Sequence, residues 1–165
     1  MPNPAPRLVF TALFAACVGL LGIGLYLQHA VGLQPCPMCI LQRYAFVAVA
    51  LVALAAALHG PLGKGQLAYA SLTGALAIAG GGVALRQTLL QRFPPDESQS
   101  CLPADLDYLL ETFPLAQALP KIFSGTGDCA KVDWRLLGLS IAEWSLICFV
   151  AVLVVSAWLI RARQR

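Results

Sequence analysis

The residues of this sequence with the clearest capacity for chemistry are cysteines, and two of them stand close together. Cys36 and Cys39 are separated by only two residues. This spacing lets both sulfur atoms close a tight disulfide ring and is typical of redox-active dithiols. A second pair, Cys101 and Cys129, follows in a polar segment with 27 residues between them. The four cysteines together predict thiol–disulfide exchange.

Other chemistries remain open for four cysteines. A structural zinc site usually contains two closely spaced pairs, whereas Cys101 and Cys129 are far apart in the sequence. Covalent haem attachment would need a histidine where Ile40 stands. Two structural disulfides would make the chain a non-enzymatic membrane scaffold whose cysteines stay oxidised. The redox interpretation is favoured because a structural disulfide rarely takes the Cys-x-x-Cys form.

The position of Cys39 favours a reactive thiolate. We expect it at or near the N-terminus of a helix, where unpaired backbone N–H groups and the helix dipole stabilise an anion. Arg43 follows one turn deeper on the same helix face. Its guanidinium is a candidate to stabilise the thiolate or to hold the polar head group of a ligand. The alternative is an interfacial arginine whose side chain extends to the membrane surface.

The elements that must position these residues are expected to be membrane-spanning helices. Of the 165 residues, 59% are hydrophobic and 12% charged, and the mean hydropathy is +0.75. At about 1.5 Å per residue, four long apolar stretches can each cross a hydrocarbon core of about 30 Å. We predict helices at about 8–28, 40–58, 66–86 and 136–160, with loops at about 29–39 and 87–135. The predicted fold is an all-α membrane protein, a four-helix bundle forming a single domain over 1–165.

The first and last apolar stretches each allow a second interpretation. The first apolar stretch is too long for a typical signal peptide and ends in a poor cleavage site, so we expect it to stay as a helix. Glu143 is the one charged residue in the last stretch. It can serve as an interfacial carboxylate or in a proton relay, and both interpretations remain open.

The long loop is expected to carry function and a short amphipathic helix. Leu106, Leu109, Leu110 and Phe113 recur at helical spacing, with acidic residues on the opposite face. Such a helix can cap the bundle or lie on the bilayer surface, and both interpretations remain open.

Helix order places all four redox cysteines on one side of the membrane, because two helices separate the loops that carry them. The basic cluster Arg161, Arg163 and Arg165 favours a cytoplasmic location for both termini. The redox cysteines are therefore expected on the periplasmic side. Cys17 and Cys148 fall near the middle of the first and last spans, where we expect small packing residues.

An electron acceptor for a membrane-embedded dithiol should itself dissolve in the bilayer, and a quinone fits this description. The sequence contains no Gly-rich dinucleotide fingerprint after a strand, so flavin or nicotinamide binding is not expected.

Along nearly its whole length the chain resembles the disulfide bond formation protein B (DsbB) family of bacterial inner membranes. The resemblance rests on a set of short motifs: Gln28-His29, Pro35-Cys36-Pro37-Met38-Cys39-Ile40, Arg43, Cys101, Gly127-Asp128-Cys129, Gly138-Leu139 and Trp144. Vitamin K epoxide reductases also combine a loop dithiol with a membrane dithiol. In those proteins the loop pair precedes the Cys-x-x-Cys motif, which is the reverse of the order in this chain.

The resemblance implies a role for each site residue. Cys36 and Cys39 would form the quinone-proximal pair, with Cys39 contacting the quinone ring and Arg43 supporting that site. Cys101 would be the sulfur attacked by a reduced DsbA-like oxidase, and Cys129 its resting partner. Gln87 would contribute a polar contact to the quinone.

The resemblance also implies the partners. We expect a periplasmic thioredoxin-fold protein of the DsbA type, either the general oxidase or the dedicated client of a DsbI-like relative. The expected acceptor is ubiquinone or menaquinone. The chain is expected to be a monomer in the inner-membrane lipid, with no metal and no nucleic-acid partner.

Overall fold

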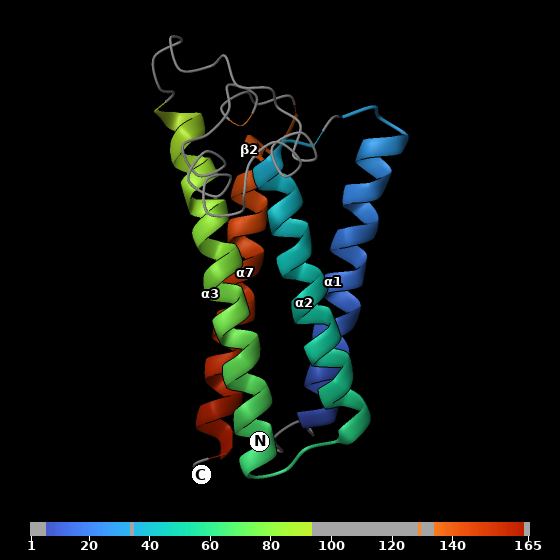
Figure 1. The fold of residues 1–165 in the computed structure, drawn as a ribbon, viewed down its shortest axis with the longest axis vertical. Coiled ribbons are helices and arrows are strands. Elements are labelled where there is room, and N and C mark those ends of the chain that lie inside the picture. The colour runs from blue at the N-terminus through green and yellow to red at the C-terminus, as the bar shows by residue number, and fades with distance from the viewer. Residues whose placement is uncertain (1–5, 34, 94–128, 130–133, 164–165) are drawn as a thin grey trace, which may run out of the picture.

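Four long helices form an antiparallel bundle in the computed structural model, which describes residues 6–33, 35–93, 129 and 134–163 (Figure 1). These helices are α1 (Pro6–His29), α2 (Pro37–His59), α3 (Lys64–Arg92) and α7 (Ile141–Arg163). Each is long and apolar enough to cross a membrane. The predicted four-helix membrane fold is confirmed. The predicted amphipathic helix of the long loop lies outside the described residues.

Helix α2 has well-defined signals at both ends. Cys36 is its N-cap, with an extended backbone, and its sulfur accepts a hydrogen bond from the backbone N–H of Cys39. Pro37 occupies the first helical position, where a backbone N–H would have no partner within the helix. At the other end Gly60 adopts a left-handed conformation, and its N–H donates to the carbonyl of Ala56. These caps fix where α2 begins and ends, and they place Cys36 and Cys39 at its start.

Three helices differ in extent from the sequence prediction. Helix α2 begins at Pro37 instead of near 40, so Cys39 lies inside the helix and not in the preceding loop. Helix α3 continues to Arg92 instead of ending near 86, so Gln87 lies inside the helix. Helix α7 begins at Ile141, because residues before it form a small antiparallel hairpin of β1 (Arg135–Leu136) and β2 (Leu139–Ser140). The turn residues between these strands, Leu137 and Gly138, both have positive φ, as type I′ hairpin turns require.

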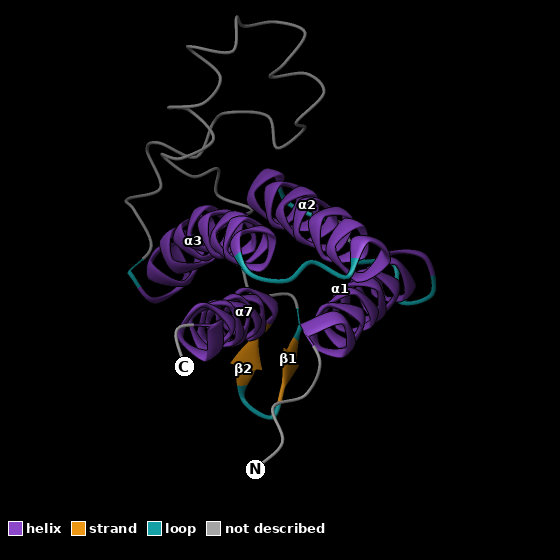
Figure 2. Cartoon of the chain, turned by 90° about the horizontal axis from the view of Figure 1, so that it is seen from below, coloured by secondary structure: helices purple, strands orange, loops and turns teal. Residues whose placement is uncertain are grey.

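The helices pack in chain order, α1 against α2, α2 against α3, and α3 against α7 (Figure 2). The rings of Phe46 and Phe149 stack in the core with centroids 4.1 Å apart. Gly80 permits this contact, because a Cβ there would lie 2.4 Å from the Phe149 ring and 2.8 Å from the Ala45 Cβ. Close approach at Gly80 therefore brings α3 against the aromatic pair.

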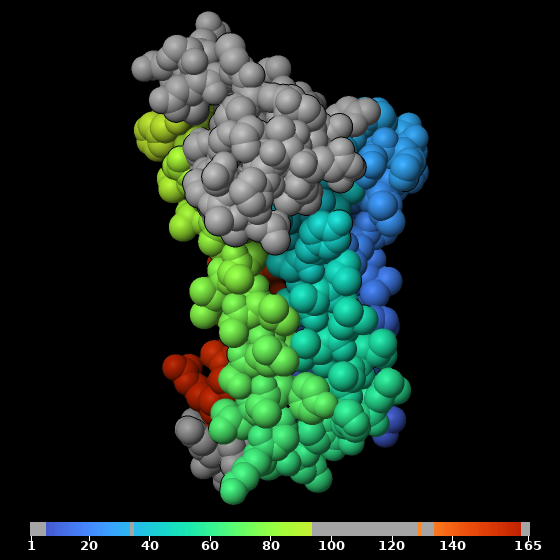
Figure 3. All heavy atoms as spheres, viewed as in Figure 1, coloured from blue at the N-terminus to red at the C-terminus, as the bar shows by residue number. Residues whose placement is uncertain are grey.

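Apolar side chains also cover much of the exterior of the bundle. Leu51, Ile78 and Val154 are each more than half exposed. Figure 3 shows α2 and α3 packed side by side along the face turned to the viewer. Helices with apolar side chains both inside and outside are suited to a lipid environment.

Candidate functional site

The Cys-x-x-Cys motif forms the start of α2 and places its two sulfur atoms together. The Cys36 and Cys39 Sγ atoms are 3.0 Å apart. Cys36 is buried, whereas Cys39 is partly exposed to a cavity. Because Cys39 lies in the first turn, the unpaired N–H groups of the helix N-terminus favour negative charge on its sulfur. The structure thus places a dithiol where a thiolate is stabilised.

Two glutamine side chains lie beside this dithiol. Gln87 contacts both sulfurs, and Gln42 contacts Gln87. The Gln87 amide Nε2 lies 3.3 Å from the Cys36 sulfur and 3.2 Å from the Cys39 sulfur. Its Oε1 accepts a hydrogen bond of 2.7 Å from Nε2 of Gln42. Both amides are buried. Gln87, predicted to contact the quinone, is therefore in direct contact with the two sulfurs.

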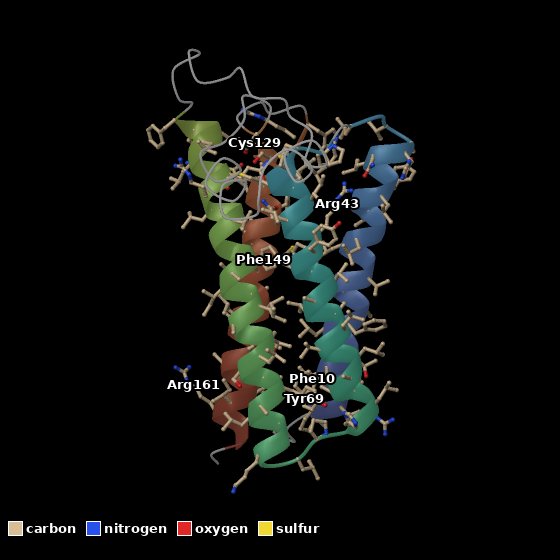
Figure 4. All side chains as sticks on the ribbon, viewed as in Figure 1. Phe10, Arg43, Tyr69, Cys129, Phe149 and Arg161 are labelled. Carbon is tan, nitrogen blue, oxygen red and sulfur yellow. The ribbon has the colours of Figure 1, made fainter. Side chains whose placement is uncertain are left out.

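Cys129 joins the same cluster from the other side. Its side chain is 1% exposed and packs with Cys36, Met38 and Leu90. A hydrogen bond between Cys129 and Cys36 is the largest of several effects that raise the pKa of Cys36, followed by the bond to Cys39 and burial. Figure 4 shows Cys129 at the end of the bundle where α2 begins. Cys101 lies outside the described residues.

Arg43 extends from α2 toward α1, one turn below the dithiol (Figure 4). Its Nη1 donates a hydrogen bond of 2.5 Å to Oε1 of Gln28, and its Nη2 donates one of 3.0 Å to the carbonyl of Gly24. These two bonds hold the guanidinium against α1. Arg43 also lines the cavity that Cys39 faces.

A cavity of about 280 Å³ connects these groups. Its walls are mainly apolar, and polar groups gather near the dithiol. It is lined by residues of all four helices and the hairpin, among them Leu20, Leu27, Cys36, Cys39, Gln42, Arg43, Phe46, Gln87, Gln91, Leu136, Trp144 and Cys148. An apolar pocket with a few convergent polar groups is the usual form of a small-molecule site.

Hydrogen bonds tie the rim of the cavity together. Arg92 of α3 pairs with Glu143 of α7 at 2.6 Å, and the other oxygen of Glu143 accepts from the backbone N–H of Ser140. The Ser140 hydroxyl donates to Oε1 of Gln91, and the Trp144 ring N–H donates to the Leu136 carbonyl. Glu143 is thus part of an ion pair at the end of the bundle, in agreement with the interfacial interpretation.

The other two cysteines lie deeper. Cys17 is buried in the main apolar core, as expected for a packing residue. Cys148 is only partly buried and contributes to the cavity wall.

Sequence analysis missed two members of the site, Gln42 and Gln91. Gln42 follows Cys39 by three residues and Gln91 follows Gln87 by four, so helical periodicity places each on the face of its partner. That signal was available for Gln42, whereas for Gln91 it depends on α3 continuing through Gln91. The predicted end of this helix near 86 excluded it.

Comparison with known proteins identifies the relatives of the chain. The family profile described as disulfide bond formation protein DsbB matches residues 6–159. Disulfide bond formation protein B of Aromatoleum aromaticum is 62% identical over 159 residues, covering 96% of this chain and 94% of that protein. The protein of the same name in Azoarcus sp. strain BH72 is 53% identical over 158 residues, with the same coverage of 96% and 94%. Disulfide bond formation protein B 1 of Pseudomonas aeruginosa is 45% identical over 153 residues, covering 93% of each chain.

Proposed function

Because this chain belongs to the DsbB family, we propose that it oxidises a periplasmic DsbA-type protein and passes the electrons to a membrane quinone. Family membership and the four spanning helices make it a multi-pass inner-membrane oxidoreductase with a role in disulfide bond formation. The observation that supports the finer proposal is one cluster of three sulfurs, Cys36, Cys39 and Cys129, beside a mainly apolar cavity that also contains Arg43.

The first exchange takes place in the long loop. A thiolate of reduced DsbA attacks Cys101 in the Cys101–Cys129 disulfide, and Cys129 leaves as a thiolate. The second DsbA thiol then attacks the DsbA sulfur of the mixed disulfide and releases Cys101. DsbA leaves oxidised, and the loop pair holds two electrons as a dithiol.

The second exchange transfers these electrons into the membrane pair. Cys129 attacks Cys36 of the Cys36–Cys39 disulfide, and Cys39 leaves as a thiolate. Cys101 then attacks Cys129, which restores the loop disulfide and frees Cys36. The contact between Cys129 and Cys36 supports Cys36 as the sulfur that is attacked, because Cys129 must reach it although Cys36 is buried.

The volume and mainly apolar lining of the cavity support a quinone as the acceptor. When bound, a quinone supplies an acceptor for two electrons and two protons. The apolar walls suit a ring with a lipid tail, and Arg43 supplies a fixed cation beside the polar end. The α2 N-terminus and the Gln87 amide stabilise negative charge on Cys39. The dithiol closes again to a disulfide when its electrons and protons have left.

The test is donor-dependent quinone reduction by the purified protein in lipid. Reduced DsbA is the donor, and ubiquinone and menaquinone analogues are supplied separately. We expect Cys101→Ser and Cys39→Ser to abolish turnover, while Cys17→Ala, in the core and not lining the cavity, retains it. Substantial turnover in Cys39→Ser would exclude the assigned path. An unaltered protein that reduces neither quinone, with its disulfides still closed, would instead support the scaffold interpretation.

A further inference from the structure

Two buried glutamines belong to the site. Gln87 contacts both sulfurs, whereas the hydrogen bond of Gln42 goes to Gln87. Gln42 is 3% exposed and lies one helical turn after Cys39, on the face of α2 that meets α3. Its side-chain Nε2 donates to Oε1 of Gln87 at 2.7 Å, which is the shortest contact that involves the Gln87 amide. Burying an amide without a firm hydrogen bond is costly, so this bond should be well populated.

With Gln42 as the donor, the bond favours the orientation of the Gln87 amide whose nitrogen faces the dithiol. With Oε1 occupied by Gln42, the Nε2 of Gln87 lies 3.2 Å from the Cys39 sulfur, whereas Oε1 is 3.7 Å from that sulfur. An amide turned by half a rotation would present its oxygen to the sulfurs. An N–H group stabilises a thiolate, and a carbonyl oxygen repels it.

We propose that Gln42 is a positioning residue, which orients the amide of Gln87 so that its N–H groups face Cys36 and Cys39 and stabilise their reduced form. Gln42 acts through Gln87 and does not itself touch the reacting atoms. Helix α2 thus supplies both the Cys39 sulfur and Gln42, and Gln42 orients the Gln87 amide of α3 toward that sulfur. The inference rests on the proposed function for its significance, because it concerns the redox balance of the proposed quinone-proximal pair.

The experiment measures this balance directly, without DsbA or added quinone. The full chain in quinone-free detergent is equilibrated with glutathione at a series of reduced-to-oxidised ratios. The fraction of Cys36–Cys39 disulfide is read by differential alkylation and peptide mass spectrometry. Gln42→Met removes the donor at similar side-chain length, and we expect the equilibrium to shift about fivefold toward the disulfide, as for the loss of one hydrogen bond.

Two further variants distinguish orientation from a general effect on packing. Gln87→Met should give a shift at least as large, and the double variant should shift no further than Gln87→Met alone, because Gln42 acts through that amide. Gln66→Met is the matched control, since Gln66 is also a buried α3 glutamine but donates to the Leu159 carbonyl at the other end of the bundle. The Cys36–Cys39 equilibrium of Gln66→Met should equal that of the unaltered protein.

An unchanged equilibrium in Gln42→Met, or shifts that multiply in the double variant, would overturn the proposal. If Gln42→Met does not fold, Gln42→His takes its place, because its ring N–H keeps a donor toward Gln87. That variant should remain near the unaltered equilibrium, and a shift as large as that of Gln87→Met would also overturn the proposal. Failure of quinone reduction would affect only the proposed function, because this equilibrium does not depend on it.

Discussion

At the scale of single residues, the two groups that surround Cys39 come from different helices and are held by different partners. Gln87 reaches it from α3, and Arg43 lies one turn below, held by Gln28 and the Gly24 carbonyl of α1. The guanidinium is therefore held beside the cavity. Its position is set by α1, and α1 should influence how the site binds its acceptor.

Changing Arg43 to Ala should weaken quinone use more than it slows the thiol chemistry. We expect the apparent KM for quinone to rise about tenfold with a smaller change in kcat, because a charged hydrogen-bond donor is lost from the cavity. Steady-state quinone reduction at saturating reduced DsbA measures this. Gln28→Leu should act in the same direction to a smaller extent.

Arg161→Ala is the control for that prediction, because Arg161 lies at the opposite end of the bundle (Figure 4). Its KM should match that of the unaltered protein. An unaltered KM in Arg43→Ala would favour the interfacial arginine that the sequence left open.

At the scale of elements, α3 is the helix on which the site most depends. It packs against both α2 and α7, supplies Gln87 and Gln91, and ends in the ion pair between Arg92 and Glu143. At Gly80 the same helix also approaches Phe149 of α7 and Ala45 of α2 closely. We therefore expect packing around Gly80 and the placement of Gln87 to be coupled through α3.

Replacing Gly80 with Ala should destabilise the bundle. The new Cβ would overlap the Phe149 ring and the Ala45 Cβ, so the helices must separate or the aromatic pair must shift. We expect a loss of about 1–3 kcal/mol, as for other overpacked cores. The thermal unfolding midpoint in detergent measures it. Gly82→Ala on the same helix meets no atom within 4 Å and should keep the midpoint or raise it. Equal midpoints for the two variants would contradict this account of Gly80.

The sequence could predict the helices of this bundle but not all of their ends. Long apolar runs determine a spanning helix almost by themselves, because lipid leaves the backbone no other partners. The hairpin before α7 was missed, since Leu136, Leu137 and Leu139 extend the apolar run and conceal the turn at Gly138. The Cys-x-x-Cys motif and Arg43 were identified from spacing alone. The partner of Arg43 on α1 was not, because contacts between helices far apart in sequence leave no local pattern.

At the scale of the whole molecule, the bundle has two chemically different ends. The clustered cysteines Cys36, Cys39 and Cys129 lie at the end where α2 begins, and the start of α1 and the end of α7 lie at the other end (Figure 1). Basic residues at the end of α7 favour the cytoplasm there, which places the cysteines on the periplasmic side as a prediction.

Single cysteines introduced at the two ends should test this orientation. Leu137 in the hairpin and Leu62 between α2 and α3 are both highly exposed leucines, 85% and 78%. In a background with the natural cysteines replaced, a membrane-impermeant maleimide should label Leu137→Cys in intact spheroplasts and Leu62→Cys only after permeabilisation. The reverse pattern would invert the topology and remove the periplasmic role.

Cys36 links the redox state of the protein to the beginning of a helix. Its sulfur is the N-cap of α2 and, in the proposed path, also the atom that changes covalent partner in each cycle. Each exchange at Cys36 should therefore disturb the hydrogen bond that closes the first turn. Pro37, with its fixed φ, limits how far that turn can unwind while the sulfur is engaged elsewhere. The protein can thus reuse one atom for helix initiation and for electron transfer, and amide hydrogen exchange in the first turn of α2 should follow its oxidation state.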